Sequence, residues 1–284
     1  MYYIPVLGAL ALATGTILQR SVLKRKSVGI KVYQCAEFLA ITLAMIPFIY
    51  FFWQMDMQAL QFKNIFIFGL VILFSITANL FTFYSMKWEE VTNLEPAKIL
   101  EPLFVIILAI FFSFFIDSHL FERNLKVIIP ALIAAAALIF SHVEKHHLKF
   151  NRYFIAAILG SFFFALELII SRLILDFYSP TTFYFLRCAS ILVISLVLFR
   201  PNFKKLGKKP RIFIFLLGLI WAVYRIVIYW GYRNLGVIFT TLVIMLGPIF
   251  IYLLAWRFLK EKINWKNIIA SIVIVLCVLY ATLS

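Results

Sequence analysis

The sequence is poor in charge, in cysteine and above all in acidic residues. Only 14% of the 284 residues are charged, with 12 acids against 27 Lys and Arg, and the three cysteines, Cys35, Cys188 and Cys277, lie far apart. Because metal and redox motifs need cysteines at short paired spacings, the thiols are interpreted as small buried apolar groups. The sequence also lacks a P-loop, a catalytic triad and a Cys/His cluster. We therefore predict no enzymatic activity, no metal, no cofactor and no ATP-driven pumping.

The rest of the chain is overwhelmingly apolar. Hydrophobic residues make up 64% of it, and its mean hydropathy is +1.02. Apolar runs of about 20 residues, enough to cross roughly 30 Å of hydrocarbon, recur from end to end. Alternating barrel strands are absent, so the spans must be helical to satisfy their backbone groups. We predict an all-α integral membrane protein of ten spans, over residues 2–19, 31–53, 64–86, 92–115, 123–141, 153–175, 180–199, 211–233, 236–258 and 264–283.

The formal net charge of +15 is concentrated in alternate loops between the spans. Loops after spans one, five, seven and nine are basic, whereas the opposite loops hold few bases and several acids. Since Lys and Arg of short loops stay in the cytoplasm, we predict a multi-pass plasma-membrane protein with both termini extracytoplasmic and no nucleic-acid partner. The basic loops carry Arg20, Lys24, Arg25 and Lys26; Lys145, Lys149 and Arg152; Arg200, Lys204, Lys205, Lys208, Lys209 and Arg211; and Lys260 and Lys262.

The two halves of the chain repeat one another. The segments 84–87 and 100–104 match 230–233 and 246–250 at one constant offset of 146 residues, from Leu100 to Leu246. Five spans per repeat is an odd number, so the second copy is inserted upside down relative to the first. Transporters built this way bind substrate near the bilayer midplane, between the repeats. The predicted organisation is a five-helix repeat over 1–141, a connecting loop over 142–152 and a second five-helix repeat over 153–284.

These features resemble those of a known family. Each half has a fourth helix bearing a proline, Pro102 and Pro248, and then an acidic residue, Asp117 or Glu122 and Glu261, before a helix rich in small residues. The pattern resembles the EamA type of the drug/metabolite transporter superfamily over nearly the whole chain. That resemblance implies the ten-helix fold and transport, but not the substrate. The two halves of the chain differ at the position before the matched prolines, where one half has Glu101 and the other has Gly247.

A charged stretch interrupts the fourth span. Residues 94–102 place Glu95, Lys98 and Glu101 on one helical arc of about 120°. A charge at the bilayer centre costs at least about 2.5–3.5 kcal/mol, so such residues normally face a protein interior or an aqueous cavity. The two prolines of the repeats each remove a helical hydrogen bond, which makes Pro102 and Pro248 candidate hinges.

Further polar side chains lie in other spans, with acids mainly in the first half and arginines in the second. Trp221, Arg225, Ile228 and Tyr232 follow one helical face, which is typical either of core packing or of a cavity wall. The charges could equally be structural pairs, with Lys98 between Glu95 and Glu101 or Arg187 neutralising Glu37. The predicted substrate-binding residues are Glu37, Asn79, Glu95, Lys98, Glu101, Glu167, Arg187, Trp221, Tyr224, Arg225 and Tyr232.

An amphoteric cavity favours a secondary transporter that moves a small zwitterion, such as an amino acid, by alternating access. Arg187 and Arg225 would hold the carboxylate and Glu37 or Glu101 the amine, while Glu101 or Glu95 could bind a coupling proton. The alternatives are an anion exchanger for sugar phosphates or nucleotide-sugars, and a glycolipid flippase or accessory membrane subunit. Besides the substrate, the expected partner is the lipid bilayer, and the protein is expected to be either a monomer or a homodimer.

Overall fold

The computed structural model describes residues 3–25, 28–89, 94, 97–115, 123–142, 151–254 and 265–283, and these residues form helices and no strand. The prediction of an all-α membrane protein is confirmed: seven described helices are long and apolar enough to span a bilayer, and three shorter apolar stretches coincide with the other predicted spans. The helices are α1 (Ile4–Leu23), α2 (Ile30–Phe52), α3 (Phe62–Trp88), α5 (Leu100–Phe115), α6 (Leu125–His142), α7 (Arg152–Arg172), α8 (Pro180–Phe199), α9 (Lys208–Asn234), α10 (Val237–Ile244), α11 (Gly247–Leu254) and α12 (Trp265–Leu283).

The ninth predicted span is broken into α10 and α11. The chain turns at Met245 and Leu246, and Pro248 is the second residue of the next helix. Pro102 likewise lies in the first turn of α5, after a turn at Ile99. In a first turn a missing N–H removes no helical hydrogen bond. The breaks therefore precede the prolines instead of kinking the helices at them, and both breaks obey the predicted offset of 146 residues. Their use as hinges stays a prediction, as does the equivalence of the two halves.

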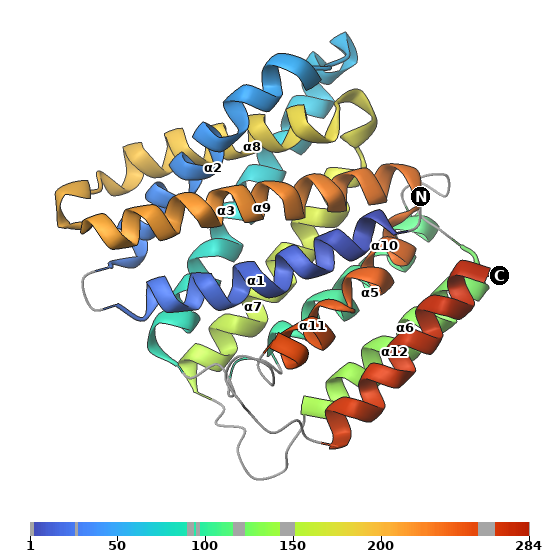
Figure 1. Ribbon diagram of the computed structural model, residues 1–284. Coiled ribbons are helices and arrows are strands. Elements are labelled where there is room, and N and C mark those ends of the chain that lie inside the picture. The colour runs from blue at the N-terminus through green and yellow to red at the C-terminus, as the bar shows by residue number, and fades with distance from the viewer. Residues whose placement is uncertain are drawn as a thin grey trace.

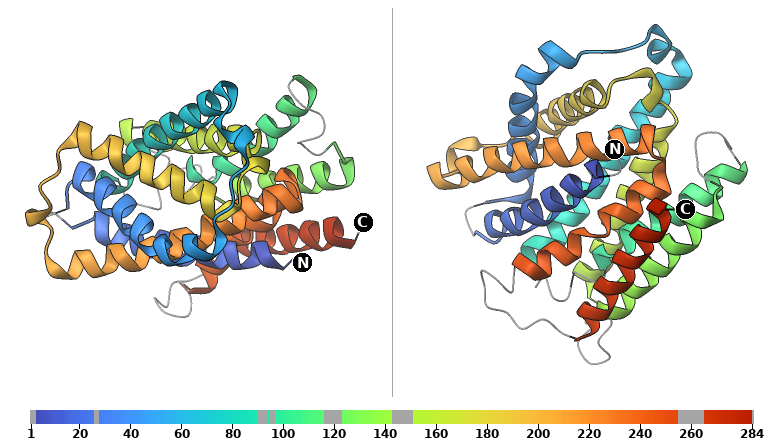
Figure 2. Two further views of the ribbon diagram at one scale, coloured as in Figure 1. Left: turned by 90° about the horizontal axis from the view of Figure 1, so that it is seen from above. Right: turned by 45° about the vertical axis from the view of Figure 1, so that its right-hand side comes forward.

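The helices surround a central cavity, and one helix pair stands at the edge. In Figures 1 and 2, α6 and α12 run side by side at the margin of the bundle, and both chain ends lie at the same end of it. Nearer the centre, α1 packs along α9, α3 packs along α7, and α2 contacts both α8 and α9. This arrangement places α1 and α9 on one side of the cavity and α3, α5 and α7 on the other.

Glycines bring the central helices into close contact. A Cβ atom on Gly218 of α9 would lie 2.8 Å from the carbonyl carbon of Ala40 on α2, and one on Gly160 of α7 would lie 2.6 Å from the Thr82 hydroxyl on α3. Small residues let membrane helices approach until their backbones touch. The two contacts draw α9 and α7, which carry most of the buried charges, toward the first half of the chain.

The end of the bundle that carries the termini is joined across the two halves. The backbone N–H of Asp56, which follows α2, donates to Phe177 O at 2.8 Å, and Ser179 N–H donates to Gln54 O at 2.9 Å. Ser179 also caps α8, because its hydroxyl accepts from Thr182 N–H. At the same end the guanidinium of Arg233 donates to the Tyr178 carbonyl at 3.0 Å. These bonds tie the connecting segments together at this end of the bundle.

Candidate functional site

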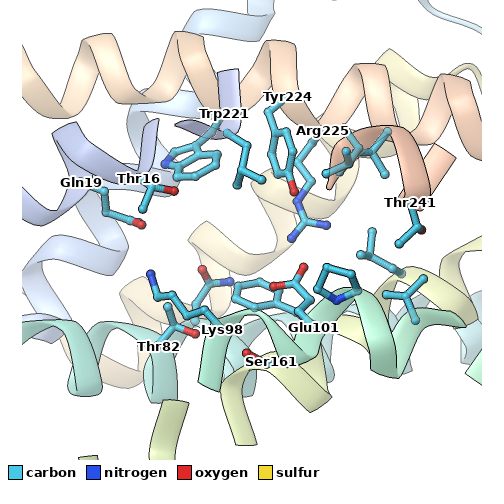
Figure 3. A pocket seen from close by; sticks show the side chains of 18 of the residues that line it. Thr16, Gln19, Thr82, Lys98, Glu101, Ser161, Trp221, Tyr224, Arg225 and Thr241 are labelled. Atoms are coloured by element: carbon cyan, nitrogen blue, oxygen red, sulfur yellow. The ribbon is translucent and has the colours of Figure 1, made fainter. Parts of the chain in front are cut away.

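The central cavity has a volume of about 230 Å³ and two facing walls. Figure 3 shows side chains of α1 and α9 reaching into it from one side, and side chains of α3, α5 and α7 reaching into it from the other. Most of the lining is apolar, with a small number of polar groups, as is usual for small-molecule sites. The labelled polar groups and aromatics of the two walls are Thr16, Gln19, Trp221, Tyr224 and Arg225, facing Thr82, Lys98, Glu101 and Ser161.

Two arginines share one fully buried carboxylate beside the cavity. Glu167 Oε2 lies 3.3 Å from the guanidinium of Arg187 and 3.2 Å from that of Arg225. Glu167 Oε1 accepts from the hydroxyl of Tyr229 at 2.7 Å, and Arg187 donates to Ser75 at 2.7 Å and to Tyr229 at 3.0 Å. We call Glu167, Arg187, Arg225, Tyr229 and Ser75 the Glu167 cluster. Its formal charge is +1, so it can hold one further anion without excess negative charge.

The two arginines of the Glu167 cluster differ in what they offer to the cavity. Arg187 is 2% exposed, and its guanidinium is used by Glu167, Ser75 and Tyr229. Among the described residues, Arg225 forms one ion pair, with Glu167, and its Nη1 has no hydrogen bond. Its guanidinium lies over the ring of Phe164 at 5.3 Å, and Figure 3 shows it pointing into the cavity. Arg225 is therefore the arginine placed to meet a ligand.

Glu101 and Lys98 stand on the wall opposite Arg225 (Figure 3). Lys98 Nζ lies 3.3 Å from Met86 Sδ. Within the described residues, Glu101 makes no ion pair and no hydrogen bond, although Arg225 and Lys98 both attract it electrostatically. The structure thus gives no ion pair between Lys98 and Glu101, contrary to the alternative that one neutralises the other. Glu95, the third charge of that stretch, lies outside the described residues.

Glu37 is held by neutral groups. Its Oε1 accepts from Gln19 Nε2 at 3.0 Å and from the Tyr33 hydroxyl at 2.9 Å. The alternative that Arg187 neutralises Glu37 is wrong, because Arg187 pairs with Glu167. A gapless comparison of the second and seventh spans aligned Glu37 with Arg187, but aligned residues of two repeats occupy equivalent places and need not touch.

The predicted aromatic face of α9 lines the cavity. Trp221, Tyr224, Ile228 and Tyr232 are all among its lining residues. The rings of Trp221 and Tyr224 meet edge to face, with centroids 5.4 Å apart, and the Tyr232 hydroxyl shares a hydrogen bond with Thr241 of α10 at 3.2 Å. Their polar edges give the apolar wall fixed hydrogen-bonding positions.

Most predicted site residues meet at this one cavity, although their role in binding substrate stays a prediction. Glu167 lies behind the wall, and Asn79 lines the cavity while its amide donates to Ser75 O. The lining residues from the predicted set, with the two prolines, are Glu37, Asn79, Lys98, Glu101, Pro102, Arg187, Trp221, Tyr224, Arg225, Tyr232 and Pro248.

Sequence reasoning missed three neutral partners of the charges: Gln19, Tyr33 and Tyr229. Tyr229 could have been found by extending the α9 face, since it follows Arg225 by one helical turn. Tyr33 likewise precedes Glu37 by one turn. Gln19 had no such signal, because its contact with Glu37 depends on the packing of α1 against α2.

Residues 151–283 match the model of the EamA-like transporter family. A solved structure described as "Crystal structure of protein" shares the fold, with a TM-score of 0.72 and 17% identity over 99% of this chain and 96% of that chain. No curated protein matches the sequence. The match places the resemblance to EamA-type transporters on the second half of the chain, and the apolar helices of both halves are those of a membrane protein.

Proposed function

We propose that this protein is a secondary transporter that moves a small zwitterionic metabolite of the amino-acid class by alternating access. The observation that carries the proposal is the facing pair in the cavity: Arg225 on α9 and Glu101 on α5 point toward each other from opposite walls without forming an ion pair. A cation and an anion held apart across a cavity are complementary to a molecule that carries both charges. Arg225 binds the carboxylate, and Glu101 binds the amine.

Within this site Arg187 positions Arg225 and does not itself contact the substrate. Arg187 and Glu167 are buried and bonded to each other, and Glu167 fixes the second guanidinium. A guanidinium presents a planar fork of donors that can bind a carboxylate through two hydrogen bonds. The Arg225 donors that Glu167 does not occupy supply that fork.

The size of the cavity supports a small substrate. Its volume of about 230 Å³ is below the roughly 300–1,000 Å³ of pockets that take drug-sized ligands. Two acids and three bases line it within the described residues, and Glu167 behind the wall pairs with two of the bases, so no large excess of positive charge favours a phosphate dianion. Both features favour an amino acid over a nucleotide-sugar or a sugar phosphate.

Alternating access requires the two halves of the protein to move against each other around the site. The hydrogen bonds that join Asp56 to Phe177 and Ser179 to Gln54 tie the two halves together at one end of the bundle. These two bonds lie between loops, so they can break without unfolding a helix. The helix breaks at Ile99 and at Met245 lie beside the site and offer places for such motion.

Glu101→Gln tests the site, because the amide keeps the volume of the side chain and removes only its charge. We expect this variant to keep its melting temperature, since Glu101 makes no ion pair in the described residues, and to lose binding and transport of amino acids. Thermal-shift measurements against amino acids, sugar phosphates and nucleotide-sugars, followed by uptake into proteoliposomes, check both expectations. An active, stable variant would remove Glu101 from the mechanism, and stabilisation by phosphates alone would favour the anion exchanger.

The proposed orientation in the plasma membrane has both termini outside. Tyr3 directly precedes α1, at the end of the bundle that carries both termini, whereas Lys204 lies in the basic loop after α8. We expect an impermeant thiol reagent applied to intact cells to label a cysteine at Tyr3 and to leave one at Lys204 unlabelled until the membrane is opened. The reverse pattern would show the opposite orientation.

A further inference from the structure

Glu37 is a buried acid that the proposed substrate site does not use. Its side chain is 3% exposed and lines the cavity from α2. Its hydrogen bonds from Gln19 and Tyr33 both go to Oε1. Across the described part of the chain, Glu37 forms no ion pair and no partner donates to Oε2. A charge buried without a counter-charge is costly, so this is a position for a group that can become neutral.

The groups around Glu37 are neutral on each helix that contacts it. They are Gln19 on α1, Tyr33 on α2 itself, and Trp221 on α9, whose indole Nε1–H faces the carboxyl group. Trp221 Nε1 has no hydrogen bond within the described residues. The charged groups of the same cavity, Lys98, Glu101 and Arg225, lie beyond ion-pair distance of Glu37.

The other two acids of the cavity have cations acting on them. Glu167 lies between two guanidiniums, so adding a proton would leave two buried cations without their counter-ion. Glu101 faces Arg225 and is attracted by Lys98 as well. Of these three acids, Glu37 is the one on which no cation acts, and its neighbours keep their bonds when it takes up a proton, because Oε1 still accepts as the carbonyl oxygen of the neutral acid.

We propose that Glu37 is the site of the coupling proton in this transporter, separate from the substrate site at Arg225 and Glu101. The inference rests on the proposed function. In the step, a proton from water forms one O–H bond at Oε2, the carboxylate becomes a neutral acid, and the same bond breaks when the proton leaves to water on the other side of the membrane. No further reactant is needed.

Trp221 connects the proton site to the substrate site. Its indole N–H faces Glu37, and its ring packs against Tyr224, next to Arg225. Ionised Glu37 attracts the indole N–H, whereas the neutral acid attracts it less. Protonation also raises the net charge around the cavity by one. Because linkage is reciprocal, proton binding then changes substrate affinity, and substrate binding changes proton affinity by the same factor.

The first test uses the proton alone as the probe, so it needs no known substrate. Tryptophan fluorescence of the protein in liposomes is titrated between about pH 5 and pH 9. We expect one step in the wild type that is absent from Glu37→Gln and from Trp221→Phe and is retained in Glu37→Asp and in Asp176→Asn, whose carboxyl group is distant and exposed. A step that persists in Glu37→Gln, or a wild type without a step, would overturn the proposal.

The second test uses proteoliposomes and a mixture of the common L-amino acids. Glu37→Gln should still exchange amino acids when no pH gradient is present, and it should lose gradient-driven accumulation. Gradient-driven accumulation by this variant contradicts the inference but leaves the proposed function intact. Absence of any amino-acid exchange in the wild type refutes the proposed function, and the titration then decides the proton site by itself.

If Glu37→Gln fails to fold, Tyr33→Phe is titrated in its place. Because Tyr33 donates to the carboxylate, its loss should move the fluorescence step to higher pH. A step at the wild-type pH would count against the proposal.

Discussion

Glu167→Gln is expected to destabilise the protein by roughly 3–5 kcal/mol, the usual cost of removing one partner from a buried ion pair. The amide keeps the volume of the side chain and can still accept from Tyr229. It leaves the guanidiniums of Arg187 and Arg225 without a counter-ion, however, and the structure pairs both with Glu167. The expected loss corresponds to a fall in apparent melting temperature on the order of 10 °C, measured on the purified protein in detergent.

Two further variants separate charge from packing in this result. Asp176→Asn removes a carboxylate that also pairs with an arginine, Arg172, but is 45% exposed, so it should cost no more than about 1 kcal/mol. Glu167→Gln/Arg187→Met removes one of the uncompensated cations and should recover part of the lost stability. A melting temperature of Glu167→Gln equal to that of the wild type would show that the Glu167 cluster does not hold the helices together.

The helices could be predicted almost entirely from the sequence, because membrane spans are set by length and hydrophobicity. Eight of the ten predicted spans are found as helices within a few residues, whereas the fourth turns at Ile99 and the ninth at Met245 and Leu246. At the second of these breaks Gly247 packs against Leu12 of α1, where a Cβ atom would lie 3.0 Å from Leu12 Cδ2. Such a contact between distant segments leaves no local pattern to read.

The residues of the site could be predicted more readily than their pairing. Charged side chains in apolar spans are rare enough that Glu37, Glu101, Arg187 and Arg225 stood out, and all four line the cavity. The pairs depend on how far each helix is rotated and shifted against its neighbours, which hydropathy does not encode. Arg172 near the end of α7, for example, is 8% exposed and bonds Asp176 one turn further on.

Arg225→Gln is expected to reduce transport at least about 30-fold while leaving the protein folded. Truncating one partner of a buried, charged contact with a ligand typically costs about 2–5 kcal/mol, and each 1.4 kcal/mol is tenfold in affinity. The fold survives because removing Arg225 leaves a balanced pair of Arg187 and Glu167, which are 3.3 Å apart. The two substitutions therefore differ in their effect on stability, because removing the charge of Glu167 leaves two cations unpaired.

The matched control is Arg211→Gln, an exposed arginine on the same helix that bonds carbonyls outside the cavity and should not affect transport. Arg225→Lys keeps the charge without the planar fork, so its uptake rate should lie between those of the wild type and Arg225→Gln. Uptake into proteoliposomes, with melting temperatures measured on the same preparations, checks all three variants. Wild-type uptake by Arg225→Gln would show that the substrate carboxylate does not bind at Arg225. A loss of uptake with an unchanged melting temperature would place the carboxylate at the Arg225 guanidinium, which Glu167 holds toward the cavity.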